Sequence, residues 1–209
     1  MTALRIVSGS ANPELAAAVA DRLDVDSLEC VLERFPDGEI CPVVDHVCGS
    51  DVHVGQPTAP PVNDHLVELL RLLDACRPER AERVTAVAPY FGYARQDRRT
   101  RSGQALGLRV VVEAIARAGA DRLVVVDPHT EALEAISPVP VEILTAVPLV
   151  PPAATWLRAL PLRRVIVTDT VAQHDSAAPF EVRSVAALLA DAIARMHHNQ
   201  PLRELLAHT

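Results

Sequence analysis

Short apolar runs alternate with amphipathic segments along most of the chain. Apolar runs bounded by polar residues are typical of strands buried on both faces of a parallel sheet. We expect strands at residues 4–8, 29–33, 52–54, 84–88, 123–126 and 164–168, and a short one at Val182. These runs predict a sheet whose strands are separated along the chain by other elements.

Between the runs, apolar residues recur at the spacing of a helix with one buried face. Asn, Asp and Ser side chains favour helix starts, and glycine favours helix ends. We expect helices that begin at Asn12, at Asn63 or Asp64, near Gln104 and at Ser184, the third ending at Gly119. The alternation predicts an α/β fold, a doubly wound, mainly parallel sheet flanked by helices in a single domain.

Two segments interrupt this alternation. Residues 36–38, Pro-Asp-Gly, predict a hairpin turn, with Phe35 exposed near its tip. Residues 138–152 are rich in proline and mark a boundary or a crossing segment. We therefore expect an α/β domain over residues 1–150, a short connector over 151–163, and a closing strand and C-terminal helix over 164–209 that pack back on the same domain.

Composition narrows the class of protein. Hydrophobic residues make up 49% of the 209 residues, and the net charge is −7. The acidic balance argues against a general nucleic-acid binder, and no apolar run is long enough to span a membrane. No basic segment followed by an apolar one opens the chain, so we expect a cytoplasmic protein. The four cysteines lack C-x-x-C spacing, which favours idle thiols over a zinc or redox site.

Four arginines, Arg95, Arg98, Arg99 and Arg101, follow the predicted strand at 84–88. In open α/β sheets, ligands bind beyond the carboxyl ends of the strands, so these cations favour an anionic ligand such as a polyphosphate. The alternative is a surface loop whose arginines are solvated or paired with an acid such as Asp97.

A second candidate site follows the predicted strand at 164–168. Asp169, His174 and Asp175 carry the oxygen and nitrogen ligands that suit Mg²⁺ or Mn²⁺. The alternative is an ordinary polar loop at the end of a strand.

Several longer motifs occur in a fixed order, at residues 8–15, 34–39, 60–64, 89–99, 118–122 and 127–129. In this set and order they resemble the ribose-phosphate pyrophosphokinase family, also called phosphoribosyl pyrophosphate synthetases. The resemblance covers roughly residues 4–150 and returns at residues 165–170 and 184–189. It implies a transferase that binds ATP with Mg²⁺.

The resemblance also implies roles for individual residues. Arg95, Gln96, Asp97 and Arg98 would bind the nucleotide, with Arg95 meeting phosphate oxygens. His129 would be catalytic together with Arg95.

The metal and the adenine are assigned in the same way. Asp127 and His129 would lie at the Mg²⁺ ion. Phe35, Asp37 and Glu39 would reach across a subunit interface and hold the adenine of a neighbour's ATP. The family resemblance thus implies a homo-oligomer, a dimer or a hexamer-type assembly.

The departures from the family are as informative. The family's second domain, with its ribose 5-phosphate site and catalytic lysine, is replaced by residues 150–160, and the chain contains no lysine. The family's regulatory phosphate-binding arginine falls on Cys48. Two hypotheses follow: an ATP-binding protein whose acceptor site lies on another chain, or a non-catalytic regulatory subunit that assembles with full-length synthetases.

Overall fold

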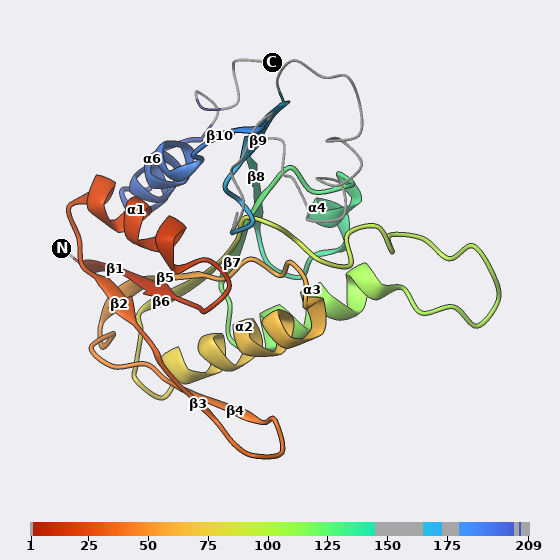
Figure 1. The fold of residues 1–209 in the computed structure, drawn as a ribbon, viewed down its shortest axis with the longest axis horizontal. Coiled ribbons are helices and arrows are strands. Elements are labelled where there is room, and N and C mark those ends of the chain that lie inside the picture. Colours follow the sequence, from red (N-terminus) through yellow and green to blue (C-terminus); the bar gives the residue numbers. More distant parts are fainter. Residues whose placement is uncertain (1, 145–164, 173–179, 203–204, 206–209) are drawn as a thin grey trace.

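A six-stranded parallel sheet forms the centre of the molecule (Figure 1). The computed structural model describes residues 2–144, 165–172, 180–202 and 205. The strands, in spatial order, are β2 (Ser27–Glu29), β1 (Ala3–Ser8), β5 (Ser50–Gly55), β6 (Arg83–Ala88), β7 (Arg122–Val126) and β8 (Val141–Leu144).

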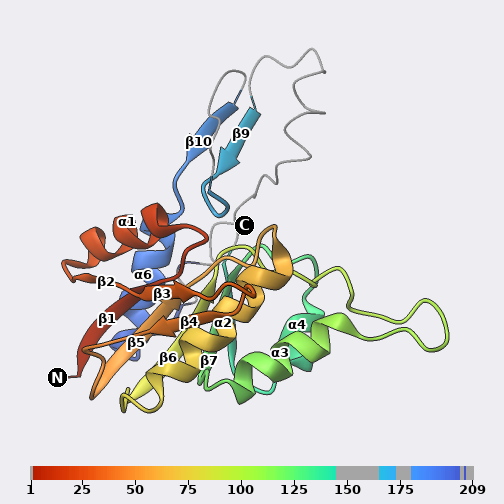
Figure 2. The same cartoon turned by 60° about the horizontal axis from the view of Figure 1, so that its bottom comes forward.

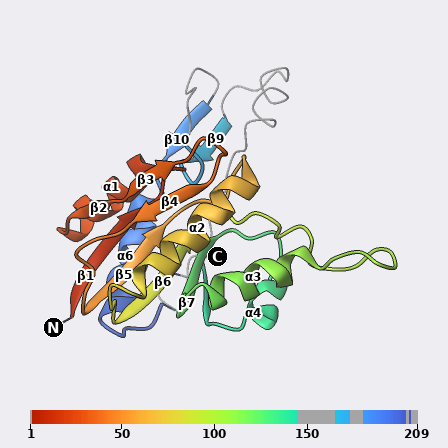
Figure 3. The same cartoon turned by 90° about the horizontal axis from the view of Figure 1, so that it is seen from below.

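Two layers of helices cover this sheet (Figures 1 and 3). The helices α1 (Pro13–Leu23) and α6 (Ala186–His197) pack together on one face, in a cluster with apolar residues of β1 and β7. The helices α2 (Val62–Cys76) and α3 (Gly107–Arg117) pack on the other face. A short helix, α4 (Ala132–Ile136), contacts α3. The prediction of a doubly wound α/β sheet flanked by helices is confirmed.

The helix starts show which local predictions hold. Asn12 caps α1 through Oδ1, which accepts a hydrogen bond from the Leu15 amide at 3.2 Å. The prediction that Asn63 or Asp64 caps α2 is wrong, because the helix begins at Val62 after Pro61 and has no side-chain cap. The third helix begins at Gly107 rather than near Gln104.

The strand at residues 29–33 is divided at Cys30, so the prediction of one strand is wrong. The first part, β2, joins the central sheet, whereas β3 (Val31–Arg34) pairs antiparallel with β4 (Ile40–Val43). The hairpin predicted from Pro-Asp-Gly is confirmed. It lies along α2 (Figure 3).

Two other strands differ from expectation. The proline-rich stretch contains β8, which extends the central sheet beside β7 and which the sequence did not predict. The strand β9 (Val165–Thr168) pairs with β10 (Phe180–Arg183) in a separate parallel pair that stands apart from the central sheet (Figure 2). Residues 151–163 lie outside the described residues.

The C-terminal helix is tied to the first helix through one acid. The Asn12 side chain donates a hydrogen bond to the Asp169 carbonyl at 2.7 Å, and the Asp169 carboxylate accepts one from the Val185 amide at 2.8 Å. The prediction that this helix begins at Ser184 is wrong, because it begins at Ala186 after Val185 and has no side-chain cap. Ser184 Oγ still accepts a hydrogen bond from the Ala186 amide at 3.1 Å. Among the described helices, none is long and apolar enough to cross a membrane.

Candidate functional site

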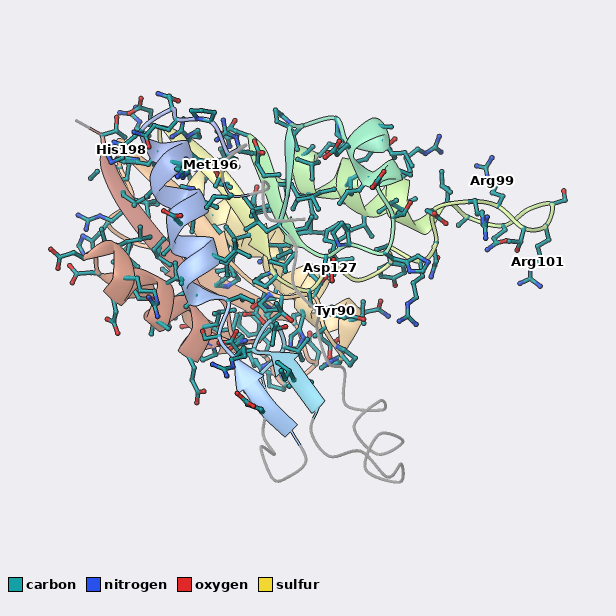
Figure 4. The ribbon with its side chains drawn as sticks, turned by 90° about the horizontal axis from the view of Figure 1, so that it is seen from above. Tyr90, Arg99, Arg101, Asp127, Met196 and His198 are labelled. Atoms are coloured by element: carbon teal, nitrogen blue, oxygen red, sulfur yellow. The ribbon has the colours of Figure 1, made fainter. Side chains whose placement is uncertain are left out.

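A pocket of about 310 Å³ opens at the carboxyl ends of β6 and β7. Its walls come from the loop after β6, with Arg95 and Gln96, and from the loop after β7, with Asp127 and His129. Tyr90 and Asp127 both line this pocket (Figure 4). The arrangement places a cation, an amide, a carboxylate and an imidazole around one opening.

The sheet explains why these loops meet. β6 and β7 are neighbours in parallel register, with Ala88 opposite Val125, so both chains leave the sheet at the same edge. Every residue from Val84 to Ala88 is buried, which fixes the strand in the core. The missed strand β8 also contributes, because the Asp127 amide donates a hydrogen bond to the Leu144 carbonyl at 2.7 Å.

Two pocket residues have left-handed backbone conformations. Tyr93 has a φ of 63° and Asp127 a φ of 49°, values that are uncommon for residues other than glycine. Such conformations persist where surrounding contacts hold them, and they concentrate at functional sites. Partial burial also raises the pKa of the Asp127 carboxyl above its ordinary value. A nearby cation would favour the ionised carboxylate.

The structure separates Arg95 from the other three arginines of the cluster. Arg95 lines the pocket, whereas residues 97–106 form a projecting arm whose base is closed by a hydrogen bond from the Leu108 amide to the Gln96 carbonyl at 3.2 Å. Arg99 and Arg101 lie far along this arm from Asp127 (Figure 4). Within the arm, the Thr100 amide and hydroxyl donate to Gln104 Oε1 at 2.9 and 2.8 Å.

Two of the proposed nucleotide-binding residues, Asp97 and Arg98, belong to this arm and do not line the pocket. The alternative was that Asp97 pairs with the arginines, but no such ion pair occurs within the part of the chain that the structure describes. Both roles therefore stay predictions.

The hairpin residues are held in a separate place. Phe35 is 47% exposed, and its amide donates to the Glu39 carbonyl at 2.8 Å, while Asp37 Oδ1 accepts from the Glu39 amide at 3.1 Å. Glu39 lines a groove of about 580 Å³ between the hairpin and α2, together with Arg34 and Arg71. Within one chain, these residues do not line the pocket at β6 and β7.

Of the second candidate site, only Asp169 belongs to the described residues. The Asp169 carboxylate is engaged by the Val185 amide at the start of α6, which is a structural role. His174 and Asp175 lie outside the described residues. The residues that sequence reasoning missed are Thr58 and Asn63, which contact the pocket loop from the segment after β5. Their partners are mainly backbone groups, and no motif marks such a contact.

The family model described as the N-terminal domain of ribose phosphate pyrophosphokinase matches residues 4–128. The chain belongs to the ribose-phosphate pyrophosphokinase family. The match spans both the pocket loop after β6 and the hairpin β3–β4, and it ends one residue before His129.

Curated relatives in this ribose-phosphate pyrophosphokinase family are similar over different lengths. The ribose-phosphate pyrophosphokinase of Rhodopirellula baltica is 44% identical over 151 residues, covering 72% of this chain and 48% of that protein. The one from Maricaulis maris is 38% identical over 201 residues, covering 95% of this chain and 62% of that protein. The chain spans about half the length of the curated relatives it matches.

Among solved structures, the crystal structure of phosphoribosylpyrophosphate synthetase from Mycobacterium smegmatis matches with a TM-score of 0.87. The sequence identity is 25%, and the match covers 95% of this chain and 100% of that chain. The fold of this ribose-phosphate pyrophosphokinase family member is therefore that of a solved phosphoribosylpyrophosphate synthetase.

Proposed function

We propose that this chain binds Mg-ATP in the pocket at the ends of β6 and β7. The observation that carries the proposal is the convergence of Arg95 and Gln96 with Asp127 and His129 around one opening. A volume of about 310 Å³ lies within the range of small-molecule sites. A guanidinium group binds phosphate oxygens through paired hydrogen bonds, so Arg95 is assigned to the triphosphate.

The donor set suits a magnesium ion shared with phosphates. Mg²⁺ usually takes one or two protein carboxylates and completes its shell with phosphate oxygens and water. Asp127 supplies one carboxylate, and His129 lies beside it in the pocket. Among the described residues, no group of three or more His, Cys, Asp or Glu side chains is placed to hold a metal alone. When bound, the ion neutralises phosphate charge.

The chain's own residues would then orient the triphosphate for transfer. Phosphoryl transfer depends on position and charge stabilisation more than on covalent chemistry by the protein. Arg95 would fix the phosphates from the β6 loop, and His129 would act from the β7 loop. We assign these two as the catalytic residues of the site, with Gln96, Asp97 and Arg98 as further nucleotide-binding residues.

The adenine site would be completed by a second copy of the chain. An exposed Phe35 can stack on a purine, and the carboxylates of Asp37 and Glu39 can accept hydrogen bonds from an exocyclic amine or ribose hydroxyls. Because these residues lie apart from their own pocket, a symmetric dimer or hexamer-type assembly would bring them to a neighbour's ATP.

The acceptor for a diphosphoryl group would lie on another chain. The chain spans about half the length of its curated relatives, and it has no lysine to place at a reacting phosphate. We therefore assign the nucleotide side of a diphosphotransferase to this protein and the acceptor side to a complementary or full-length synthetase subunit.

Calorimetric titration with Mg-ATP tests the proposal, with the mass of the assembly measured by light scattering. Arg95→Ala should abolish or strongly weaken binding, because it removes the phosphate-binding cation. Arg22→Ala, at the end of α1 on the other face of the sheet, is the matched control and should bind as the wild type does. A folded wild-type protein that ignores millimolar Mg-ATP contradicts the proposal.

The alternative, a non-catalytic assembly subunit, is favoured by the hairpin alone. Val31, Phe35 and Val43 are exposed apolar residues on β3–β4. Such a surface is typical of a protein contact. A protein that fails to bind Mg-ATP but co-purifies with a full-length synthetase through this hairpin would identify the second function.

A further inference from the structure

The segment after β5 lies directly against the pocket loop after β6. Thr58 has 1% of its surface exposed, and its hydroxyl makes two hydrogen bonds to that loop. Oγ1 accepts from the Gly92 amide at 2.7 Å and donates to the Tyr90 carbonyl at 3.1 Å. The Thr58 amide donates to the same carbonyl at 2.8 Å. One buried side chain therefore fixes both ends of the Tyr90–Gly92 turn.

The loop and the segment after β5 lie too close together to admit a side chain at Gly92. A Cβ atom added at Gly92 would lie 2.8 Å from the Thr58 carbonyl oxygen and 2.7 Å from Val62 Cγ1. Both distances are shorter than a carbon atom tolerates, so the two backbones approach as closely as glycine allows. The position of the loop is consequently set by the segment beneath it.

A second bond holds the next residue of the loop. The Tyr93 hydroxyl donates to Asn63 Oδ1 in the first turn of α2, at 2.5 Å. Tyr93 is the residue with the left-handed φ of 63°, a conformation that needs support from its surroundings. Arg95 follows two positions later and has no ion pair among the described residues. The position of its side chain therefore depends on the backbone of this loop.

We propose that Thr58 and Asn63 are positioning residues for the pocket. Neither lines it; both hold Tyr90–Tyr93 so that the chain presents Arg95 and Gln96 opposite Asp127 and His129. This inference rests on the proposed function, since it takes Mg-ATP as the ligand of the pocket. It assigns ligand affinity to two side chains that the ligand does not touch.

Thr58→Val and Thr58→Ser form a matched pair. Valine keeps the shape but removes the hydroxyl, whereas serine keeps the hydroxyl. Mg-ATP titrated well below the unfolding temperature should bind about tenfold more weakly to Thr58→Val, because a buried amide loses its acceptor, and within about twofold of the wild type to Thr58→Ser. If valine lowers only the melting temperature and leaves the affinity of the folded protein unchanged, Thr58 is merely structural and the proposal fails.

Asn63 is tested with its partner. Asn63→Leu and Tyr93→Phe should each weaken Mg-ATP binding about three- to tenfold, and the double variant should be no weaker than either, because both remove one bond. Asn63→Asp keeps an acceptor and should restore the affinity. Additive losses, or an Asp variant as weak as the Leu variant, overturn the role of Asn63.

Amide hydrogen exchange separates this inference from the proposed function. In nucleotide-free protein, Thr58→Val should speed exchange at residues 92–96 and leave Thr58→Ser at the wild-type rate. Unchanged exchange in the valine variant overturns the inference whatever the nucleotide does. If the wild type binds no Mg-ATP, the proposed function fails, and faster exchange still supports the contact as the support of this loop.

Discussion

Glu68 on helix α2 holds Ser10 of the β1–α1 loop with both of its carboxylate oxygens. Oε1 accepts from the Ser10 amide and Oε2 from the Ser10 hydroxyl, each at 2.6 Å, and Glu68 is 1% exposed. The pair lies at the carboxyl ends of β1 and β5, where the order of the strands reverses. Open α/β sheets usually bind ligands at such a switch point. Here a buried carboxylate of the chain itself lies at the switch point, and the candidate pocket lies farther along the sheet.

Replacing Glu68 should destabilise the fold more than replacing its partner. We expect Glu68→Ala to lower the free energy of unfolding by about 2 to 3 kcal/mol, because a buried amide and a hydroxyl lose a charged acceptor. Ser10→Ala removes only the hydroxyl bond and should cost about 1 kcal/mol. Urea unfolding measures both. Equal losses in the two variants would show that the bond to the backbone amide contributes nothing.

His53 should make the stability depend on pH in the acid range. It is 1% exposed, neither ring nitrogen has a hydrogen-bond partner within the described chain, and burial lowers its pKa to about 4. The unfolded chain takes up this proton near pH 6.5, so the unfolded state binds more protons between the two values. Stability should therefore fall by up to about 3 kcal/mol as the pH falls from 6.5 to 4.

His53→Leu should remove this loss, measured by urea unfolding across that pH range, while exposed His198→Ala keeps it. Neighbouring Asp51 contributes at lower pH. Burial opposes its ionisation, but hydrogen bonds from Arg83 and His197 lower its pKa. A leucine variant with the wild-type pH dependence would assign the effect to other groups.

Gly107, the first residue of α3, should control the side chain of Gln96. A Cβ atom there would lie 2.3 Å from Gln96 Oε1. Gly107→Ala should displace the amide and weaken Mg-ATP binding about three- to tenfold, the worth of one hydrogen bond. Gly55→Ala is the control, because its Cβ would meet its nearest neighbours at 3.8 Å. Equal titration curves for both variants would exclude Gln96 from the nucleotide site.

Phe35 should matter for assembly and not for folding. Because it is 47% exposed, Phe35→Ala should change the free energy of unfolding by less than about 0.5 kcal/mol. It should lower the association of copies measured by sedimentation, and Mg-ATP binding with it. Val110→Ala, an exposed apolar residue on α3, is the matched control. Association that survives Phe35→Ala would place the contact elsewhere.

The sequence predicted the elements that burial alone determines. β6 and β7 are apolar runs in the centre of the sheet, and the family motifs carried the pocket residues Arg95, Asp127 and His129. The strand β8 was not predicted, because prolines surround it and Glu142 interrupts its apolar residues. Its pairing with β7 is a tertiary contact that overrides the local signal for a turn.

The contacts that shape the site were harder to foresee. The arginine cluster is divided by one backbone hydrogen bond between Leu108 and Gln96, and backbone bonds leave no trace in side-chain patterns. Asn63 has the residue type of a helix cap, but it lies inside the helix and accepts from Tyr93. Residue type indicated a polar partner, and only the fold could say which one.

Because the base of the arm at residues 97–106 is closed, the length of the arm can change without a change in the geometry of the pocket. Its two ends are fixed at Gln96 and Leu108 whatever lies between them. Doubling the length of a flexible loop costs only about 0.6 kcal/mol in closure entropy. The part of the arm beyond Arg98 is therefore a place where a peptide tag or a fluorescent label can be inserted without moving Arg95.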